Sequence, residues 1–307
     1  MPRAKDWALI VRPPIVLISV LGASVGFLNT VYLGGVPFPW VGYLVNAGAA
    51  ALLAAGLMVH NDYYDLASDR VNRPHKVLAQ GRIRATTARD VGFALMILGV
   101  VAAFAGHPRG TLVESVNWTA GAIAVTVLGD GLLYNTIGKK HGIGGHIEVA
   151  YGVAMIPAFG AAGAGNAFYV LPLALGLFVM EIGREIMVAC GDIEGDRRAG
   201  WITLPVRIGM RKALVAAVFL YLASAPLFLL PFLYNTPDQL EFIGPPRAWH
   251  PSLLYGVSST GFVAGLIALW VPCFRDPSFA NFERYIRTGS RVLVLLFQLA
   301  LLAEAFV

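Results

Sequence analysis

Charge is scarce in this 307-residue chain. Only 13% of the residues are Asp, Glu, Lys or Arg, whereas 57% are hydrophobic and the mean hydropathy is +0.67. A soluble globule of this length needs more charge to cover its surface, so the composition excludes an ordinary water-soluble enzyme. The two cysteines, Cys190 and Cys273, are too few for a disulfide framework or a cysteine-rich zinc site, and both end apolar runs, where we expect them to fill space.

Familiar catalytic signatures are also missing from the sequence. It contains no Walker loop for phosphates, no HExxH zinc motif and no nucleophile elbow. What it has in abundance is long apolar windows, each able to cross a bilayer. They lie at residues 14–34, 43–62, 90–107, 117–136, 146–165, 168–190, 212–233, 251–274 and 289–307. The sequence therefore predicts an all-α, polytopic membrane bundle of about nine transmembrane helices.

The positions of the basic residues give the bundle an orientation. With the N-terminus inside and the windows alternating in direction, 21 of the 23 Lys and Arg fall on inside segments, and only Arg109 and Arg247 fall outside. The positive-inside rule predicts this bias, so the N-terminus is expected on the cytoplasmic face. The net charge of +5 is then explained by the basic residues of the cytoplasmic segments, and a nucleic-acid partner is not expected.

Two acidic motifs follow the second and sixth windows. The first is NDYYDLASD at 61–69, in which Asn61, Asp65 and Asp69 recur every four residues and share one face of a continuing helix. The second is DIEGD at 192–196, whose two aspartates are one turn apart. Because the two windows are four apart, we expect both motifs on the cytoplasmic face.

Stacked carboxylates at a membrane boundary repel one another and resist desolvation. Mg²⁺ removes both problems because it prefers carboxylate oxygens together with substrate phosphates. Two such clusters facing each other can hold a diphosphate between metal ions, with Arg and Lys taking the remaining charge. The alternative is that the motifs are solvated loops or helix caps. Two motifs on the same side at matching window ends favour the metal site.

These residues resemble the UbiA superfamily of intramembrane prenyltransferases. Residues 61–69 match that family's NDxxDxxxD, and NRP at 72–74 with GRI at 81–83 continues the pattern. Residues 184–205 are similar to its second aspartate motif, as are Leu-Tyr-Asn at 133–135 and the Lys-containing loop that follows. The resemblance covers essentially the whole chain and implies a single domain, 1–307, with its helices around a central cavity.

The resemblance also implies an activity: Mg²⁺-dependent transfer of a prenyl group from an isoprenyl diphosphate to a lipophilic acceptor, aromatic or lipid-like, within the bilayer. By motif position, the residues implied for metal-bound diphosphate are Asn61, Asp62, Asp65, Asp69, Asp192 and Asp196. The residues expected to contact the substrate are Asn61, Arg70, Arg73, Lys139, Lys140 and Arg197. The residues expected to act in catalysis are Asp65, Asp192, Tyr134 and Asp130.

Among subgroups, the second motif is most similar to enzymes that geranylgeranylate glycerol phosphate ethers or the chlorophyll side chain. Three dipeptides depart from the ether-lipid pattern. This chain has Lys-Val at 76–77, Gly-His at 145–146 and Val-Ala at 188–189, where the pattern has Arg-Pro, Gly-Asn and Lys-Asp. The resemblance therefore leaves the acceptor open, together with prenyl length and oligomeric state.

Ionisable groups inside the windows are expensive in lipid and usually face a polar cavity. Asp130 precedes Tyr134 by one turn; it is expected either to meet the acceptor, as ligand or base, or to be a protonated, hydrogen-bonded group in the bundle. Tyr134 is expected to help shield a carbocation. Glu181, Arg184 and Glu185 allow local pairing at i, i+3 and i, i+4, which predicts a salt-bridged network, with contact to the acceptor as the alternative.

Two other functions use the same features. A terpene cyclase on the same scaffold would need the same ionisation step, and motif sequence does not separate the two. A cation-coupled transporter would also use acidic pairs, but its sites usually lie near the middle of the bilayer, whereas these carboxylates cluster at one face.

Overall fold

The apolar windows all contain helices, which satisfy backbone N–H and C=O groups without water. In the computed structural model the long helices are α2 (Pro13–Leu33), α3 (Trp40–Tyr64), α5 (Ala85–Ala105), α6 (Trp118–Thr136), α7 (Gly144–Gly163), α8 (Leu171–Arg198), α10 (Met210–Leu233), α11 (Leu253–Arg275) and α13 (Ser290–Glu304). The structure describes residues 3–33, 37–105, 116–138, 141–198, 200–233, 252–304 and 306. Arg109, Lys139, Lys140 and Arg247 lie outside these residues, so what was expected of them stays a prediction.

Shorter elements connect the long helices. They are α1 (Ala4–Ile10), α4 (Leu66–Asn72), η2 (Ala167–Val170), α9 (Leu204–Ile208), α12 (Phe279–Asn281) and the π-helix η4 (Phe282–Gly289). Two short strands, β1 (His141–Gly142) and β2 (Ile202–Thr203), pair in parallel, with His141 opposite Ile202 and Gly142 opposite Thr203. This pair ties the link between α6 and α7 to the segment that follows α8.

Six helical segments of the described chain are long and apolar enough to cross a membrane. They are α2, α3, α5, α10, α11 and the segment Phe279–Glu304, which ends in α13. The other three long helices, α6, α7 and α8, carry Asp130, Glu148 and Arg184 among their apolar residues. The all-helical membrane bundle is thus confirmed, whereas a full count of nine crossings stays a prediction.

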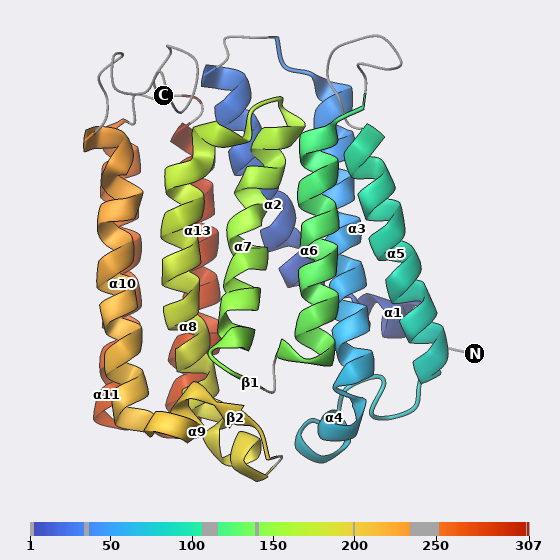
Figure 1. The fold of residues 1–307 in the computed structure, drawn as a ribbon, viewed down its shortest axis with the longest axis vertical. Coiled ribbons are helices and arrows are strands. Elements are labelled where there is room, and N and C mark those ends of the chain that lie inside the picture. Colours follow the sequence, from blue (N-terminus) through green and yellow to red (C-terminus); the bar gives the residue numbers. More distant parts are fainter. Residues whose placement is uncertain are drawn as a thin grey trace.

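The long helices form a closed ring. Each long helix packs against the next one along the chain, and α13 returns to pack against α2. In addition α2 packs against α7 across the ring (Figure 1). This central contact is close: a Cβ at Gly26 would lie 1.8 Å from the carbonyl oxygen of Pro157, and one at Gly160 would lie 1.8 Å from that of Ala23. Glycine is required at both positions for the backbones to touch.

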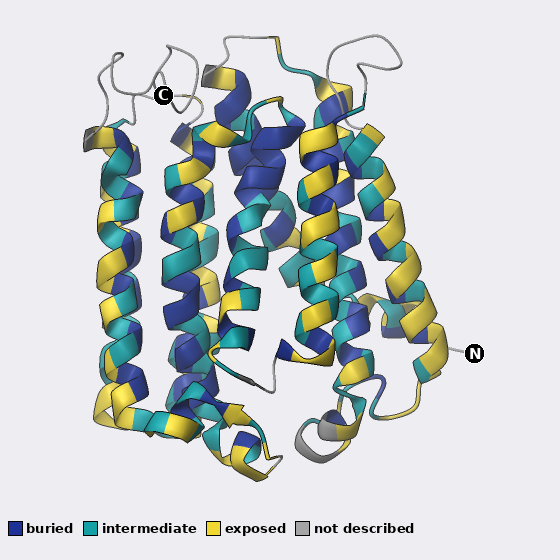
Figure 2. Cartoon of the chain, in the orientation of Figure 1, coloured by how far each residue is buried: buried dark blue, intermediate teal, exposed yellow. Residues whose placement is uncertain are grey.

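Apolar side chains cover the outside of the ring as well as its interior. Phe93 and Leu98 on α5 and Phe219 and Leu222 on α10 are exposed, and Figure 2 shows exposed residues along the outer faces of these helices. Such surfaces suit contact with lipid tails.

Both aspartate motifs lie at the same end of the ring. Helix α3 runs into α4, and α8 runs towards β2 and α9; α4, β1, β2 and α9 all gather at the lower end in Figure 1. The expectation that the two motifs share one end of the bundle is therefore met by the structure. The side of the membrane on which this end lies stays a prediction.

Candidate active site

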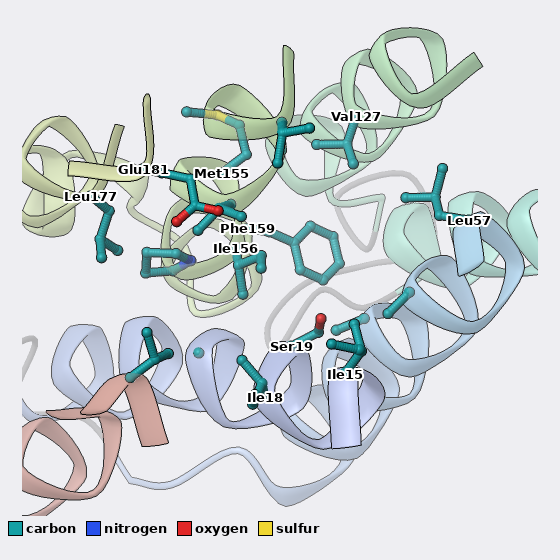
Figure 3. A pocket seen from close by; sticks show the side chains of 18 of the residues that line it. Ile15, Ile18, Ser19, Leu57, Val127, Met155, Ile156, Phe159, Leu177 and Glu181 are labelled. Carbon is teal, nitrogen blue, oxygen red and sulfur yellow. The ribbon is translucent and has the colours of Figure 1, made fainter. Parts of the chain in front are cut away.

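A cavity of about 450 Å³ lies inside the ring, and its lining residues come from α2, α3, α6, α7, α8, α11 and α13, together with Arg12. Most of its wall is apolar. Figure 3 shows Ile156 and Phe159 of α7 facing Ile18 and Ser19 of α2 across this space. Most of the polar residues of the wall lie towards the end that holds the aspartate motifs: Arg12, Asn61, Asp130, Tyr134, Asn135, Glu148, Arg184, Glu185, Ser290 and Arg291. Ser19, Glu181 and Gln298 also line the wall.

The first motif keeps its four-residue spacing although α3 ends at Tyr64. Asp65 retains a helical backbone, its N–H bonds to the carbonyl of Asn61 at 2.9 Å, and the N–H of Asp69 bonds to the carbonyl of Asp65 at 2.7 Å. Successive turns therefore carry Asn61, Asp65 and Asp69, as the sequence predicted. Of these three, Asn61 lines the cavity.

Basic residues from two other segments neutralise this motif. Lys76 Nζ lies 2.9 Å from Asp62 Oδ1 and 2.7 Å from Asp69 Oδ2, and Arg12 forms a second ion pair with Asp62. Both aspartates are buried, at 5% and 4% exposure, so unpaired charges here would be costly. Asp62 is held by two cations, which distinguishes its surroundings from those of Asn61 on the open cavity wall.

The positions of Arg12 and Lys76 are themselves fixed by the N-terminal helix. Arg12, between α1 and α2, has a left-handed backbone (φ 52°), an uncommon conformation for a residue other than glycine. Asp6 of α1 pairs with Arg82 at 2.6 Å, which joins α1 to the segment that carries Lys76. Buried Ile10, Val59 and Leu78 belong to one hydrophobic cluster, which joins α1, α3 and the segment after α4.

The second motif is built in the same way at the end of α8. Arg287 of η4 forms an ion pair with Asp192 and a second pair with Glu283 at 2.8 Å. Thr203 of β2 donates a hydrogen bond of 3.0 Å from its hydroxyl to Asp196. Asp196 lies beyond the predicted span, and burial raises its pKa to about 6, a shift that the hydrogen bond from Thr203 opposes.

The two motifs meet around one residue of α6. Tyr134 lines the cavity, and its phenol interacts electrostatically with Asp65 of the first motif and Asp196 of the second, and also with Glu148 and Glu185. Asp130, one turn earlier on the same helix, also lines the cavity. Both motifs therefore lie near enough to the polar end of the cavity to influence Tyr134 electrostatically, and Asn61 is the motif residue that lines its wall.

The donor set at this end suits a hard divalent cation, because it consists of carboxylate and amide oxygens. Asn61 Oδ1 is buried and has no hydrogen-bond partner among the described residues, so it is free to accept a metal or a donor. Within the same part of the chain, no three His, Cys, Asp or Glu side chains are gathered closely enough to hold a metal by themselves. A metal here would need ligands from both motifs and from the substrate.

The arginines predicted to contact the substrate differ in their exposure to solvent. Arg70 is exposed and Arg73 is half-buried, both next to the first motif. Arg197 is 62% exposed in its side chain and lies 3.9 Å from Glu194, also an exposed group, so its charge is turned towards solvent. Neither arginine of the first loop lines the cavity.

The charged network on α8 agrees with the prediction from the sequence. Arg184 pairs with Glu181 at 2.5 Å and also with Glu185, and Glu181 is only 3% exposed. Glu148 occupies the space beside Gly138, where a Cβ would lie 1.4 Å from its Oε2. Arg184 on the cavity wall is therefore paired with two glutamates. Two further acids of the wall, Asp130 and Glu148, form no ion pair among the described residues.

Sequence reasoning missed the partners of the motif aspartates. Arg12 and Arg287 were counted only as basic residues that obey the topology rule, and Lys76 was noted in addition only as a departure from the ether-lipid pattern. Spacing within a helix reveals neighbours three or four residues apart. Arg12 and Asp62 are 50 residues apart, and Arg287 and Asp192 are 95 apart, so only the packing of distant segments reveals these pairs.

Comparison with known proteins was made for the sequence and for the fold. The profile of the UbiA prenyltransferase family matches residues 16–274. A digeranylgeranylglyceryl phosphate synthase from Korarchaeum cryptofilum is 30% identical over 241 residues, 76% of this chain and 79% of that protein. The protein of the same name from Ignicoccus hospitalis is 32% identical over 235 residues, 74% of this chain and 72% of that protein.

Two solved structures share the fold. One comes from work on digeranylgeranylglyceryl phosphate synthase in membranes, with a TM-score of 0.72, 23% identity and 98% coverage of both chains. The other is a UbiA homologue from Archaeoglobus fulgidus bound to GPP and Mg²⁺, with a TM-score of 0.71, 18% identity and the same coverage.

Proposed function

The chain belongs to the UbiA prenyltransferase family, and we propose that it transfers a prenyl group from an isoprenyl diphosphate to a lipophilic acceptor in a single domain, residues 1–307. The observation that carries this proposal is that both aspartate motifs lie at the end of the bundle where Asn61 and Tyr134 line the polar part of a largely apolar cavity. The names of the relatives and the GPP and Mg²⁺ bound by the Archaeoglobus structure support a prenyl diphosphate as donor and a divalent metal, Mg²⁺, as cofactor.

The residues proposed to hold the diphosphate and its metal are Asn61, Asp62, Asp65, Asp69, Asp192 and Asp196. Bound Mg²⁺ would supply Lewis-acid stabilisation of the departing diphosphate. Arg73 is positioned beside the first motif to take part of the remaining negative charge, and we keep Arg70, Lys139, Lys140 and Arg197 as candidates for the same task. The exposure of Arg197 makes it the least favoured of them.

Breaking the allylic C–O bond leaves a carbocation that water would capture. The apolar wall of the cavity excludes water, and the aromatic face of Tyr134 next to the polar end is suited to stabilise the cation. The prenyl tail would extend along the apolar wall formed by residues such as Ile18, Leu57 and Phe159.

A nucleophile that adds to the cation must lose a proton. Asp130 lies one turn from Tyr134 on the cavity wall and has no ion-pair partner among the residues described, so its carboxylate is the proposed acceptor of that proton. The new bond joins the acceptor to the first prenyl carbon, the electron pair of the broken bond leaves with diphosphate, and the proton passes to Asp130.

We further propose that the end of the ring bearing the motifs faces the cytoplasm. The bias of basic residues towards this end supports that orientation, since Arg12, Lys76, Arg197 and Arg287 all lie there. Labelling of single cysteines introduced beside α4 or α9 in sealed vesicles tests the orientation.

The function is tested with purified protein in detergent. Prenyl diphosphates of several lengths are supplied with Mg²⁺, with and without candidate acceptors, and pyrophosphate release and product mass are followed. Adducts that require an acceptor are the expected result. Cyclic hydrocarbons without acceptor would replace the proposal with a terpene cyclase, and the absence of pyrophosphate release with every donor would overturn it.

A further inference from the structure

Two amide side chains on the cavity wall each leave an oxygen atom without a partner. They belong to Asn61 of α3 and to Asn135 in the last turn of α6. In both residues Oδ1 is buried and accepts no hydrogen bond from any residue that the structure describes. Asn135 as a whole is only 3% exposed, so a partner for its oxygen has to come from the cavity that it lines.

The direction of the Asn135 amide is fixed by His60. Nδ2 of Asn135 lies 3.0 Å from Nδ1 of His60, and both side chains are buried. An amide nitrogen has no lone pair with which to accept, so Asn135 donates, Nδ1 of His60 accepts, and the imidazole carries its proton on Nε2. The ring of Tyr64 packs against the imidazole, with the ring centroids 4.9 Å apart. The nitrogen of the amide is therefore held against α3, and its oxygen remains for the cavity.

The same hydrogen bond places Asn135 beside the first aspartate motif. His60 directly precedes Asn61 on α3, and α3 packs against α6 (Figure 1). Asn135 thus contacts the residue next to the first position of the motif, although it lies on another helix. Two neutral oxygen atoms, one from each helix, are offered at the polar end of one cavity.

The chemistry of these two atoms selects a cation over the diphosphate. Phosphate oxygens accept hydrogen bonds, as amide oxygens do, so a diphosphate by itself cannot satisfy them. Carbonyl-type oxygens suit Mg²⁺ and Mn²⁺. The acids of the motif differ in this respect, because Asp62 and Asp69 already pair with Lys76. Amide ligands also add no negative charge, so a metal ion that they hold keeps its positive charge for the diphosphate.

We propose that Asn135 is a ligand of the divalent metal and that His60 is the residue that positions it. The inference rests on the proposed function and adds a third segment, α6, to a metal site that was assigned to the two aspartate motifs alone. It also answers a need of that site, since no three His, Cys, Asp or Glu side chains lie close enough together in the described ranges to hold a metal. His60 acts only through Asn135 and touches neither metal nor substrate.

The test measures metal affinity without turnover. Mn²⁺ replaces Mg²⁺ because it takes the same oxygen ligands and is detected by electron paramagnetic resonance. Full-length protein in detergent is titrated with Mn²⁺ in the presence of a prenyl thiolodiphosphate, whose bridging sulfur resists ionisation, and the Kd of this analogue is also measured without metal. N117A is the matched control: Asn117 is a buried asparagine at the other end of α6, where it caps the helix and does not line the cavity.

N135L removes the amide and should raise the Kd for Mn²⁺ at least about tenfold, whereas N135D keeps an oxygen ligand and should bind Mn²⁺ at least as tightly as wild type. N117A should lower the melting temperature and leave this Kd unchanged. H60N keeps a hydrogen-bond acceptor at the place of Nδ1 and should retain the affinity for Mn²⁺. H60Q moves the acceptor to the place of Nε2 and should weaken the affinity at least about fivefold.

An unchanged Kd for Mn²⁺ in N135L would overturn the inference. Weaker binding of the analogue without metal would overturn it too, because the amide nitrogen would then face the substrate. If N135L does not fold, the two His60 variants decide, and an equal Kd for Mn²⁺ in H60N and H60Q contradicts the positioning role. If wild type neither binds Mn²⁺ with the analogue nor releases pyrophosphate from a prenyl diphosphate, the proposed function fails. If wild type does both and N135L binds Mn²⁺ equally well, only this inference fails.

Discussion

Lys76 donates a hydrogen bond of 2.7 Å from its Nζ to Oδ2 of Asp69, which is 4% exposed. The same ammonium lies 2.9 Å from Asp62, so one side chain from the segment after α4 bridges two acids of the first motif. A buried carboxylate without a cation would be strongly destabilising. Lys76 therefore supplies positive charge that a divalent cation could also supply.

Replacing Lys76 with Ala should lower the free energy of unfolding of the metal-free protein by about 1–3 kcal/mol, because Asp69 loses its partner while Asp62 keeps Arg12. Mg²⁺ should then raise the melting temperature of the variant more than that of wild type. Thermal unfolding in detergent, with and without Mg²⁺, measures both effects. R89Q is the control, since Arg89 pairs with Asp90 at the exposed surface and its loss should leave the melting temperature unchanged. An unchanged melting temperature for K76A would contradict the bridging role.

Asp65 and Asp192 should each be indispensable for turnover. D65A and D192A remove a carboxylate from one of the two motifs, and each should lower the rate of pyrophosphate release at least about 100-fold while the far-UV circular dichroism stays unchanged. E194A is the matched control because Glu194 lies two residues from Asp192, is 63% exposed and pairs with the neighbouring Arg197 and Arg198. Near-normal rates in D65A or D192A would remove these residues from the site.

The network on α8 should be important for stability. Arg184 is the cation between Glu181 and Glu185, and Glu181 is 3% exposed, so R184M leaves two acids unpaired in the bundle. We expect a loss of about 3–5 kcal/mol in the free energy of unfolding. E185Q should lower the free energy of unfolding less than R184M does, because Arg184 still pairs with Glu181. Thermal unfolding of both variants provides the measurement, and a larger loss for E185Q than for R184M would contradict the network.

The sequence predicted those features that depend on spacing along one helix. The turn-by-turn placement of Asn61, Asp65 and Asp69 and the pairing of Glu181 with Arg184 follow from helical periodicity alone. The sharing of one end by both motifs followed from the alternation of apolar windows. Contacts between distant segments, such as Arg287 with Asp192, did not follow, because no local pattern encodes which helices become neighbours in a ring.

The cations paired with the motif aspartates were hidden for the same reason. Arg12 and Arg287 were counted among the basic residues that orient the bundle, and only the folded arrangement shows that they meet Asp62 and Asp192. Spacing also does not predict which residues of one motif are buried against a cation. Asp62 and Asp69 pair with Lys76, whereas Asn61 of the same motif faces the cavity.

Tyr134 should control whether the carbocation reaches the acceptor or water. Tyr134 lines the cavity at the end that holds both motifs, where an aromatic face can stabilise positive charge and keep water away. Y134F keeps the ring and should retain most of the transfer product. Y134A opens space beside the ionising bond, so it should lower the transfer rate at least about tenfold and raise the fraction of prenyl alcohol, which mass spectrometry of the products measures. Equal product ratios in Y134F and Y134A would show that the ring does not shield the cation, whereas an equal loss of rate in Y134F would assign the role to the hydroxyl instead.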